Sequence, residues 1–365
     1  MALQCGIVGL PNVGKSTLFN ALTSAKALVA NYPFATKDPN LGIITVPDER
    51  LDALSAIVNP EKVQPTTVEI LDIAGLIKGA SKGEGLGNQF LANIREVDAI
   101  VHVVRCFVDD NVIHVDGNVD PVRDKAIIDM ELILKDMETM EKRIEKLKKG
   151  TKGGDKEELK KLEFAQSLYN HLESENSARS FEVPDGMEAA YKELYLLTGK
   201  PILYVCNVDE SSVLTGNEMT DKFKELVADE NAEVILISAG IEADIAELET
   251  KEERMEFVEE MGLSEPGVNR VITACYKLLN LITYFTAGEK EVRAWTIEDG
   301  WKAPAAAGVI HTDFEKGFIR AEVIKYNDYI EFGSEAAVKE AGKMGVEGKE
   351  YVVTDGDVMH FRFNV

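Results

Sequence analysis

Residues 9–17 read Gly-Leu-Pro-Asn-Val-Gly-Lys-Ser-Thr, and this stretch decides the fold of the chain. It follows an apolar run at residues 5–8 that predicts a buried strand, and residues 17–22 have the apolar spacing of a helix. A glycine-rich turn between a strand and a helix N-terminus points backbone N–H groups and the positive helix end at one place, which suits a polyphosphate. The stretch therefore predicts a P-loop.

Two side chains of this loop are expected to act on a bound nucleoside triphosphate. Lys15 can reach the β- and γ-phosphates and assist catalysis, and the Ser16 hydroxyl can ligate Mg²⁺. The loop residues expected to hold the nucleotide are Asn12, Val13, Gly14, Lys15, Ser16 and Thr17.

Length, charge and cysteine content limit the number of domains, the partners and the location that the protein can have. A chain of 365 residues can form two or three domains, and a net charge of −24 argues against binding nucleic acid over the whole surface. The four cysteines are far apart and fit neither a zinc pattern nor a disulfide framework, which indicates a reducing location. No apolar run has membrane-spanning length and the P-loop begins at residue 9, so we expect a cytoplasmic protein without a membrane partner.

Two later segments are expected to complete the magnesium and phosphate site. Thr36, in the polar loop 31–36, could ligate Mg²⁺ while a triphosphate is bound. Asp72 follows a predicted strand at residues 66–71 and could hold Mg²⁺ through water, and the Gly75 N–H would then sense the γ-phosphate as part of the catalytic machinery. The Asp-x-x-Gly pattern is weak by itself, and its position one strand after the Thr36 loop supports it.

The group that orients the attacking water is less obvious. Leu76 stands where many GTPases carry a Gln for this task. His114 lies after a predicted strand at residues 98–104, where an imidazole could orient water; the alternative is a loop histidine without a role. Asn12 occupies the position at which certain related GTPases hold K⁺, so K⁺ is a candidate cofactor beside Mg²⁺.

Two more predicted strands, residues 201–206 and 234–237, end in loops that could bind the base. The loops occupy the positions of the NKxD and SAx motifs of guanine-nucleotide proteins, but Val208 replaces the usual Lys and Glu210 replaces the Asp that binds guanine. We expect the Asn207 amide to meet adenine with both a donor and an acceptor. The residues expected at the base are Asn207, Val208, Glu210, Ser238, Ala239 and Gly240.

Residues 124–172 interrupt the alternation of strands and helices. Apolar residues three and four apart, a glycine-containing break at residues 150–154 and a second periodic run predict an antiparallel helical hairpin. Between residues 142 and 161 there are nine basic and four acidic residues. This basic island fits either a solvated helical face or a surface for RNA phosphates.

The motifs resemble those of the YchF family of Obg-like ATPases, in the translation-factor-related P-loop class. The resemblance covers nearly the whole chain: the GLPNVGKST loop, the apolar Leu76, the Asn-x-x-Glu motif at residues 207–210, the hairpin, and a TGS-like module at residues 281–365. Short β-rich runs at 292–297, 317–323 and 351–353 predict strands in that module. The resemblance implies a preference for ATP over GTP and association with the ribosome, both the large subunit and the whole particle.

We therefore expect an α/β fold with a doubly wound, mostly parallel P-loop sheet, an inserted helical hairpin and a C-terminal β-grasp domain. The expected domains are residues 1–123 and 200–280 for nucleotide binding, 124–199 for the hairpin and 281–365 for the TGS-like module. The expected function is a monomeric, ribosome-binding ATPase that acts as a switch in translation. The alternatives are a GTP-dependent nucleic-acid-binding protein, a small-molecule P-loop kinase and a binding module with a silent nucleotide site.

Overall fold

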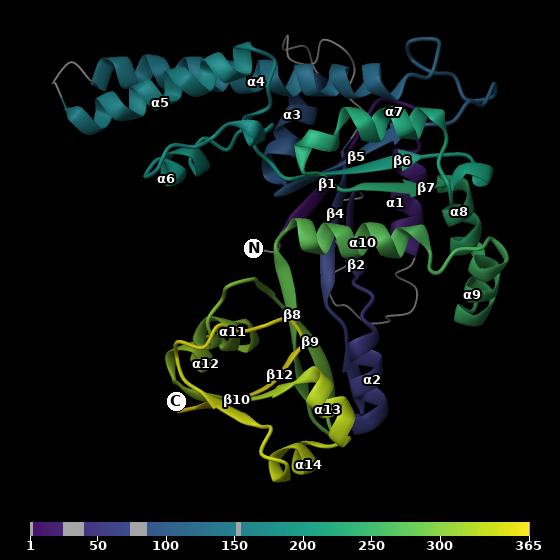
Figure 1. Cartoon of the computed structure of the whole chain (residues 1–365), viewed down its shortest axis with the longest axis vertical. Helices are drawn as coiled ribbons and strands as arrows, with labels where there is room; N and C mark the ends of the chain where they lie inside the picture. Colours follow the sequence, from purple (N-terminus) through teal and green to yellow (C-terminus); the bar gives the residue numbers. More distant parts are fainter. Residues whose placement is uncertain (1–2, 25–39, 74–85, 151–154, 365) are drawn as a thin grey trace. The chain divides into compact units, whose positions relative to one another are not determined.

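The computed structural model describes residues 3–24, 40–73, 86–150 and 155–364 (Figure 1). The chain forms two compact units, Met1–Gly42 with Glu69–Val271 and Ile43–Val68 with Ile272–Val365. No helix in the described ranges is both long and apolar enough to cross a membrane.

The sheet of the first unit has six strands in the order β2-β4-β1-β5-β6-β7. Their bounds are β1 Gln4–Val8, β2 Leu41–Thr45, β4 Thr67–Asp72, β5 Ala99–Arg105, β6 Ile202–Asn207 and β7 Val234–Ile237. The pairs β1–β4, β1–β5, β5–β6 and β6–β7 are parallel, which confirms the predicted mostly parallel sheet. Strands β5 and β6 are buried at every residue, and this burial explains their mostly apolar sequences.

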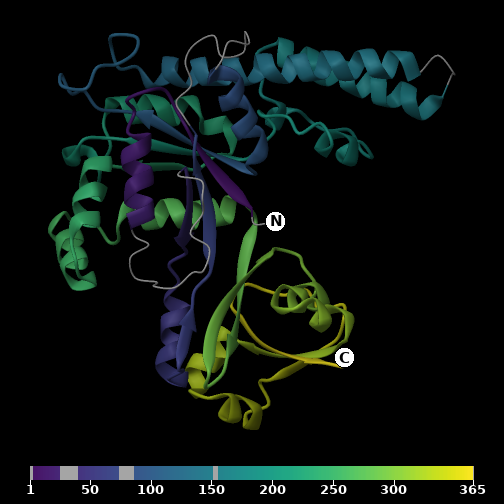
Figure 2. The same cartoon turned by 180° about the vertical axis from the view of Figure 1, so that it is seen from behind.

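Helices cover both faces of this sheet (Figures 1 and 2). Helices α1 and α8 pack together on one face, and α4 and α7 pack together on the other. The helix bounds in this part of the chain are α1 Lys15–Ser24, α3 Leu86–Glu96, α4 Pro121–Gly150, α5 Lys156–Glu173, α6 Glu188–Lys192, α7 Glu218–Leu226, α8 Ala239–Glu247, α9 Lys251–Glu260 and α10 Gly267–Leu278.

Helices α4 and α5 are the two arms of the predicted hairpin and lie side by side (Figures 1 and 2). Their contact buries an apolar cluster that includes Met140, Ile144, Phe164 and Leu168. The Asp155 carboxylate caps α5 by accepting a hydrogen bond from the Glu157 N–H at 2.9 Å. Lysines of both arms are exposed between the buried positions: Lys142, Lys146, Lys148 and Lys149 of α4, and Lys156 and Lys160 of α5.

The second unit contains a mixed sheet in the order β11-β10-β12-β8-β9-β3. The strands are β3 Lys62–Gln64, β8 Leu281–Ala287, β9 Glu291–Glu298, β10 Phe318–Lys325, β11 Gly345–Glu347 and β12 Asp357–Phe363, and the helices are α2 Glu49–Val58, α11 Ala303–Ile310, α12 Thr312–Lys316, α13 Tyr326–Phe332 and α14 Glu335–Glu340. Strands β8 and β12 are parallel neighbours, while β8–β9 and β10–β12 are antiparallel. This is the β-grasp arrangement.

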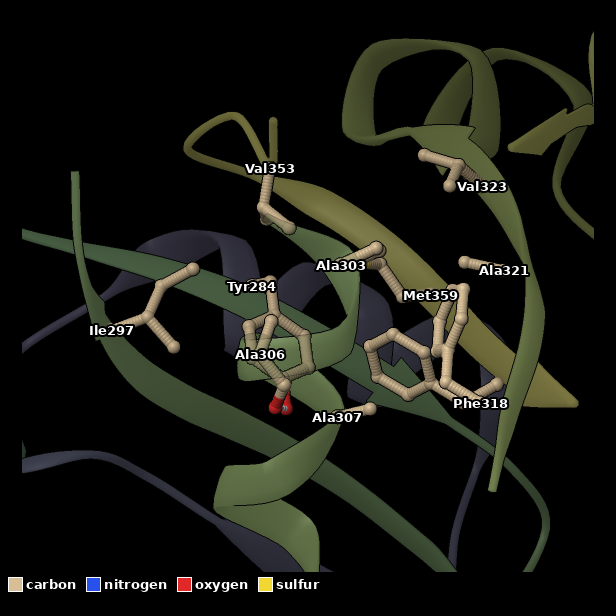
Figure 3. Close-up of a cluster of buried hydrophobic side chains, with 11 residues drawn as sticks. Tyr284, Ile297, Ala303, Ala306, Ala307, Phe318, Ala321, Val323, Val353 and Met359 are labelled. Atoms are coloured by element: carbon tan, nitrogen blue, oxygen red, sulfur yellow. Dashed lines mark hydrogen bonds between the residues drawn. The ribbon is translucent and has the colours of Figure 1, made fainter. Parts of the chain in front are cut away.

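The core of this unit forms where α11 meets the sheet (Figure 3). Ala303, Ala306 and Ala307 are fully buried, and their small side chains let α11 approach the aromatic rings of the strands. The Tyr284 hydroxyl donates a hydrogen bond to the Ala306 carbonyl at 2.9 Å, which satisfies its buried polar atom.

The prediction of a strand at residues 351–353 is wrong. Val352 makes an isolated bridge with Lys302, and the strand that follows is β12. The Asp357 carboxylate accepts hydrogen bonds from the Thr354 N–H and hydroxyl, both at 2.9 Å, and these bonds turn the chain before β12 begins.

The compact units also differ from the expected domain boundaries, which assign residues 43–68 to the nucleotide-binding domain. Leu51 and Leu54 of α2 belong to one buried cluster with Phe285 and Val292 of the second unit. Strand β3 extends the second sheet by pairing in parallel with β9. Apolar burial and strand pairing therefore place α2 and β3 of this segment with the C-terminal residues, while its ends belong to β2 and β4 of the first sheet.

Candidate nucleotide-binding site

The P-loop connects β1 to α1 in a conformation that requires its glycines. Gly14 has a φ of +98°, and a Cβ at this position would collide with the Asn207 side chain. At Gly9 a Cβ would lie 2.5 Å from the Val103 carbonyl oxygen. The loop backbone thus approaches β5 and β6 more closely than any side chain permits.

Lys15 is buried at the first position of α1. Its ammonium group donates a hydrogen bond to the Leu10 carbonyl at 2.6 Å, across the loop. Burial lowers the pKa of Lys15 to about 8, and the nearby Asp72 carboxylate opposes this shift. The positive charge is therefore held inside the loop that the sequence assigns to phosphate.

Ser16 and Asp72 meet, as expected of two residues that share a magnesium ion. Asp72 lies beside Ile7 in the β1–β4 register, and its carboxylate is hydrogen-bonded to the Ser16 hydroxyl. Burial raises the pKa of Asp72, and the Lys15 charge and the Ser16 hydrogen bond work against this effect. Two oxygen donors at one point suit Mg²⁺, which these residues would hold directly or through water.

Three residues of the sequence-based site lie outside the described residues: Thr36, Gly75 and Leu76. Their predicted roles in magnesium binding, phosphate sensing and water positioning stay predictions.

The amide of Asn207 has a structural role that the sequence analysis did not foresee. Its Nδ2 donates to the Val13 carbonyl at 3.0 Å, and its Oδ1 accepts from the Ala239 N–H at 2.9 Å. The side chain is buried, so it ties the P-loop to the loop after β7. The expected use of this amide as the main reader of adenine is not what the structure shows, because both of its polar atoms already have backbone partners.

The remaining base-loop residues have mixed surroundings. Val208 and Ala239 are buried, Ser238 caps α8 by accepting from the Ile241 N–H, and Gly240 lies in the first turn of α8. Glu210 is exposed at the start of a 3₁₀ turn, and its side chain has no hydrogen-bond or ion-pair partner in the part of the chain that the structure describes. A cavity of about 680 Å³ lies beside Asp209 and is lined in part by Phe107, Val108 and Met219.

His114 is buried between β5 and α4 rather than exposed on its loop. Its Nδ1 accepts a hydrogen bond from the Asp116 N–H at 3.2 Å, and its Nε2 lies 2.8 Å from the Asp124 carboxylate. A neutral ring therefore carries its proton on Nε2 and donates it to Asp124. In this conformation neither ring nitrogen is free to orient water, so a catalytic role requires a rearrangement of the loop.

Arg105 is a residue whose importance sequence analysis missed. Its guanidinium is buried at the end of β5 and donates to three backbone carbonyls of the following loop, those of Phe107, Asp109 and Val112, at 3.1, 3.2 and 2.9 Å. Burial lowers the pKa of this side chain. The signal was an arginine that closes an otherwise apolar strand, a position at which a charge needs several partners.

Asn12 connects this loop to the P-loop. It adopts a positive φ of 61°, and its Nδ2 donates to the Ile113 carbonyl at 3.0 Å. The residue predicted to hold K⁺ is therefore also a direct link between the phosphate-binding loop and the segment that carries His114.

A parallel sheet, a P-loop with a buried lysine, and a Ser16–Asp72 pair on the neighbouring strand define the class of this protein as a P-loop nucleoside triphosphatase. Two family models match the chain. One, described as a 50S ribosome-binding GTPase, matches residues 4–146, and one named YchF-GTPase_C, described as a protein of unknown function (DUF933), matches residues 281–364.

Relatives over the full length narrow this class. The chain is 59% identical to the ribosome-binding ATPase YchF of Bacillus subtilis (strain 168) and 56% identical to that of Escherichia coli O157:H7, each covering 100% of both sequences. The solved YchF GTPase of Schizosaccharomyces pombe superposes with a TM-score of 0.90 at 42% identity, covering 99% of this chain and 97% of that one. This chain belongs to the YchF family.

Proposed function

We propose that this protein is a cytoplasmic ATPase that binds the ribosome and acts as a nucleotide-dependent switch in translation. The observation that carries the proposal is the base loop at residues 207–210. Its Asn207 is hydrogen-bonded to the P-loop, but Glu210 stands where guanine-nucleotide proteins carry the guanine-binding aspartate. The names of the bacterial relatives support both ATP and the ribosome, and the 50S description of the matching family model supports contact with the large subunit.

The preference for ATP follows from the absence of the aspartate that binds guanine in guanine-nucleotide proteins. Guanine offers adjacent N1–H and N2–H donors, which an Asp accepts in guanine-nucleotide proteins. Glu210 stands in that position, is one methylene longer, and is exposed without a partner among the described residues. Since Asn207 already binds Val13 and Ala239, discrimination rests on this lost guanine contact rather than on a full pair of hydrogen bonds to adenine.

We expect ATP to bind at least tenfold more tightly than GTP, a difference of about 1.4 kcal/mol. Equilibrium titration of both nucleotides with Mg²⁺ measures it, and Glu210→Asp is the matched variant, which should narrow the gap by restoring a carboxylate of the usual length. Equal or tighter binding of GTP by the wild-type protein would contradict this assignment.

We also propose that Asn12 helps to hold a K⁺ ion against the phosphates. Replacing Na⁺ by K⁺ in hydrolysis assays should then raise kcat, and an unchanged kcat would contradict the proposed cation site.

The basic island of the hairpin is proposed to contact RNA phosphates on the ribosome. Lys142 and Lys146 of α4 and Lys156 and Lys160 of α5 are exposed and lie on arms that pack against each other. Clustered lysines release counterions when they neutralise phosphates, so such a contact weakens steeply with salt. In a chain of net charge −24 this is a local exception, which favours a binding role over general solubility.

Changing Lys142, Lys146 and Lys156 to Glu should weaken ribosome binding and reduce the slope of log K against log salt by about 2 to 3. Lys224, Lys251 and Lys277 are exposed outside the hairpin, and their change to Glu is the control with the same total charge. ATP affinity should be unchanged in both variants. Co-sedimentation with ribosomes across a salt series measures both effects. If the two triple variants bind ribosomes equally well at each salt concentration, the basic island is only a solvated helical face.

We further propose that His114 orients the attacking water once a partner rearranges its loop, because Leu76 cannot. His114→Ala should then lower ribosome-stimulated kcat at least tenfold with little change in ATP affinity. Asp124→Asn is the control, since it retains an acceptor for Nε2 and leaves the imidazole in place. Wild-type hydrolysis by His114→Ala, alone and with ribosomes, would show that the histidine has only the packing role seen here.

A further inference from the structure

The loop between β5 and α4 holds apolar side chains in solvent. Ile113 and Val108 are 78% and 70% exposed, the two highest values for large apolar side chains among the described residues, and Val115 is 51% exposed. Exposed apolar side chains gathered on one short loop favour a partner that covers them. We call residues 108–116 the acidic loop, because they include three aspartates and neither Lys nor Arg.

The acidic loop exposes these apolar side chains in a conformation that buried hydrogen bonds define. Arg105 holds the loop backbone through three carbonyls, and His114 anchors it from inside through Asp124. Because backbone carbonyls and the His114 ring are bound inward, the side chains of Val108, Ile113 and Val115 are left exposed. A loop that was merely unstructured would not need a buried arginine to shape it.

The charge of the loop restricts the kind of partner. Asp109, Asp110 and Asp116 are exposed, and the sequence contains neither Lys nor Arg from residue 107 to residue 122. RNA phosphates would be repelled from this surface. A basic polypeptide segment that carries an apolar side chain complements both the carboxylates and the apolar groups.

The side chain of Asn12 also joins the loop to the nucleotide site. Asn12 of the P-loop donates to the carbonyl of Ile113, whose own side chain is the most exposed of the three. A partner that shifts Ile113 therefore acts on the P-loop backbone through one hydrogen bond. Asn12 has a positive φ of 61°, a conformation that is uncommon for residues other than Gly but that Asn tolerates better than most.

We propose that the acidic loop is the docking surface for a basic protein segment of the ribosome, and that docking is transmitted to the P-loop through the Asn12–Ile113 hydrogen bond. This inference rests on the proposed ribosome-binding function. It assigns the two projecting features opposite partners: the hairpin binds RNA phosphates, and the acidic loop binds protein.

The first test measures ribosome-stimulated ATP hydrolysis relative to the basal rate. Val108→Ser with Ile113→Ser should reduce the stimulation at least fivefold and co-sedimentation at most twofold, because the hairpin contact remains. Leu214→Ser is the matched control, since Leu214 is 58% exposed elsewhere in the first unit. Asp109→Lys with Asp110→Lys should reduce the stimulation similarly without removing an apolar group, which guards against a folding defect in the first variant.

Asn12→Ala tests the transmission. It should retain co-sedimentation while losing stimulation, and Asn12→Gln, which keeps an amide donor, should recover part of it. Normal stimulation of Asn12→Ala would overturn the transmission step.

The second test identifies the chemistry of the partner. A benzophenone side chain placed at Val115 should crosslink on the ribosome to a protein, giving an adduct that protease removes. An adduct that only nuclease removes, or wild-type stimulation in both double variants, would overturn the docking surface. Failure of the wild-type protein to co-sediment with ribosomes would overturn the proposed ribosome binding itself. Co-sedimentation without any stimulation would leave ribosome binding in place and overturn this inference.

Discussion

Lys15→Ala is expected to lower kcat for ATP hydrolysis by roughly a hundredfold to a thousandfold, the largest functional effect of any single substitution considered. The ammonium group is buried in the P-loop, close enough to Asp72 to affect its pKa, and bound to the Leu10 carbonyl. A positive charge in this poorly solvated position stabilises the charge that develops on the transferred phosphate far more than a charge in water does.

Phosphate release at saturating ATP measures this effect, with Asn20→Ala as the control, because Asn20 is exposed in the same helix, carries no charge and lies outside the nucleotide-binding loop. Retention of more than a tenth of the wild-type rate in Lys15→Ala would show that the lysine does not stabilise the transition state.

The same lysine predicts a pH dependence of ATP affinity. The pKa of Lys15 is about 8 without a ligand, and a bound phosphate raises it by favouring the charged form. Between these two pKa values ATP binding takes up a proton, so the Kd should increase with pH above about 8, by up to about tenfold per pH unit. Lys15→Arg, whose charge persists to much higher pH, should flatten this dependence.

Asp136→Ala is expected to reduce the free energy of unfolding of the first unit by roughly 3 to 5 kcal/mol, since it leaves buried donors without an acceptor. Asp136 of α4 is buried and accepts from the Leu197 N–H at 2.8 Å, the Thr198 N–H at 2.8 Å and the Thr198 hydroxyl at 2.7 Å. These bonds attach the hairpin's first helix to the segment that leads into β6.

Asp136→Asn keeps the volume and one acceptor oxygen, so its loss of stability should be smaller. Urea denaturation monitored by circular dichroism compares the variants, and hydrogen exchange at the Leu197 and Thr198 amides locates the change. If the alanine variant unfolds within about 0.5 kcal/mol of wild type, the carboxylate does not stabilise this junction.

The local sequence determined the elements that depend on near neighbours. The P-loop is a contiguous motif whose glycines, lysine and serine lie within eight residues, and β5 and β6 are mostly apolar because both of their faces are covered. The hairpin helices follow from apolar spacing, and the Ser16–Asp72 contact follows from two motifs on adjacent parallel strands.

The tertiary structure decided the contacts that join residues far apart in the chain. Asn207 and Val13 are 194 residues apart, and only the folded sheet reveals that the Asn207 amide is hydrogen-bonded to the P-loop backbone. The burial of His114 depends on Asp124 lying at the start of α4, and α2 packs with the second unit because its apolar side chains find partners more than two hundred residues later. Spacing along a sequence specifies which groups a segment carries, whereas hydrogen-bond partners and buried surfaces are settled by which segments the fold brings together.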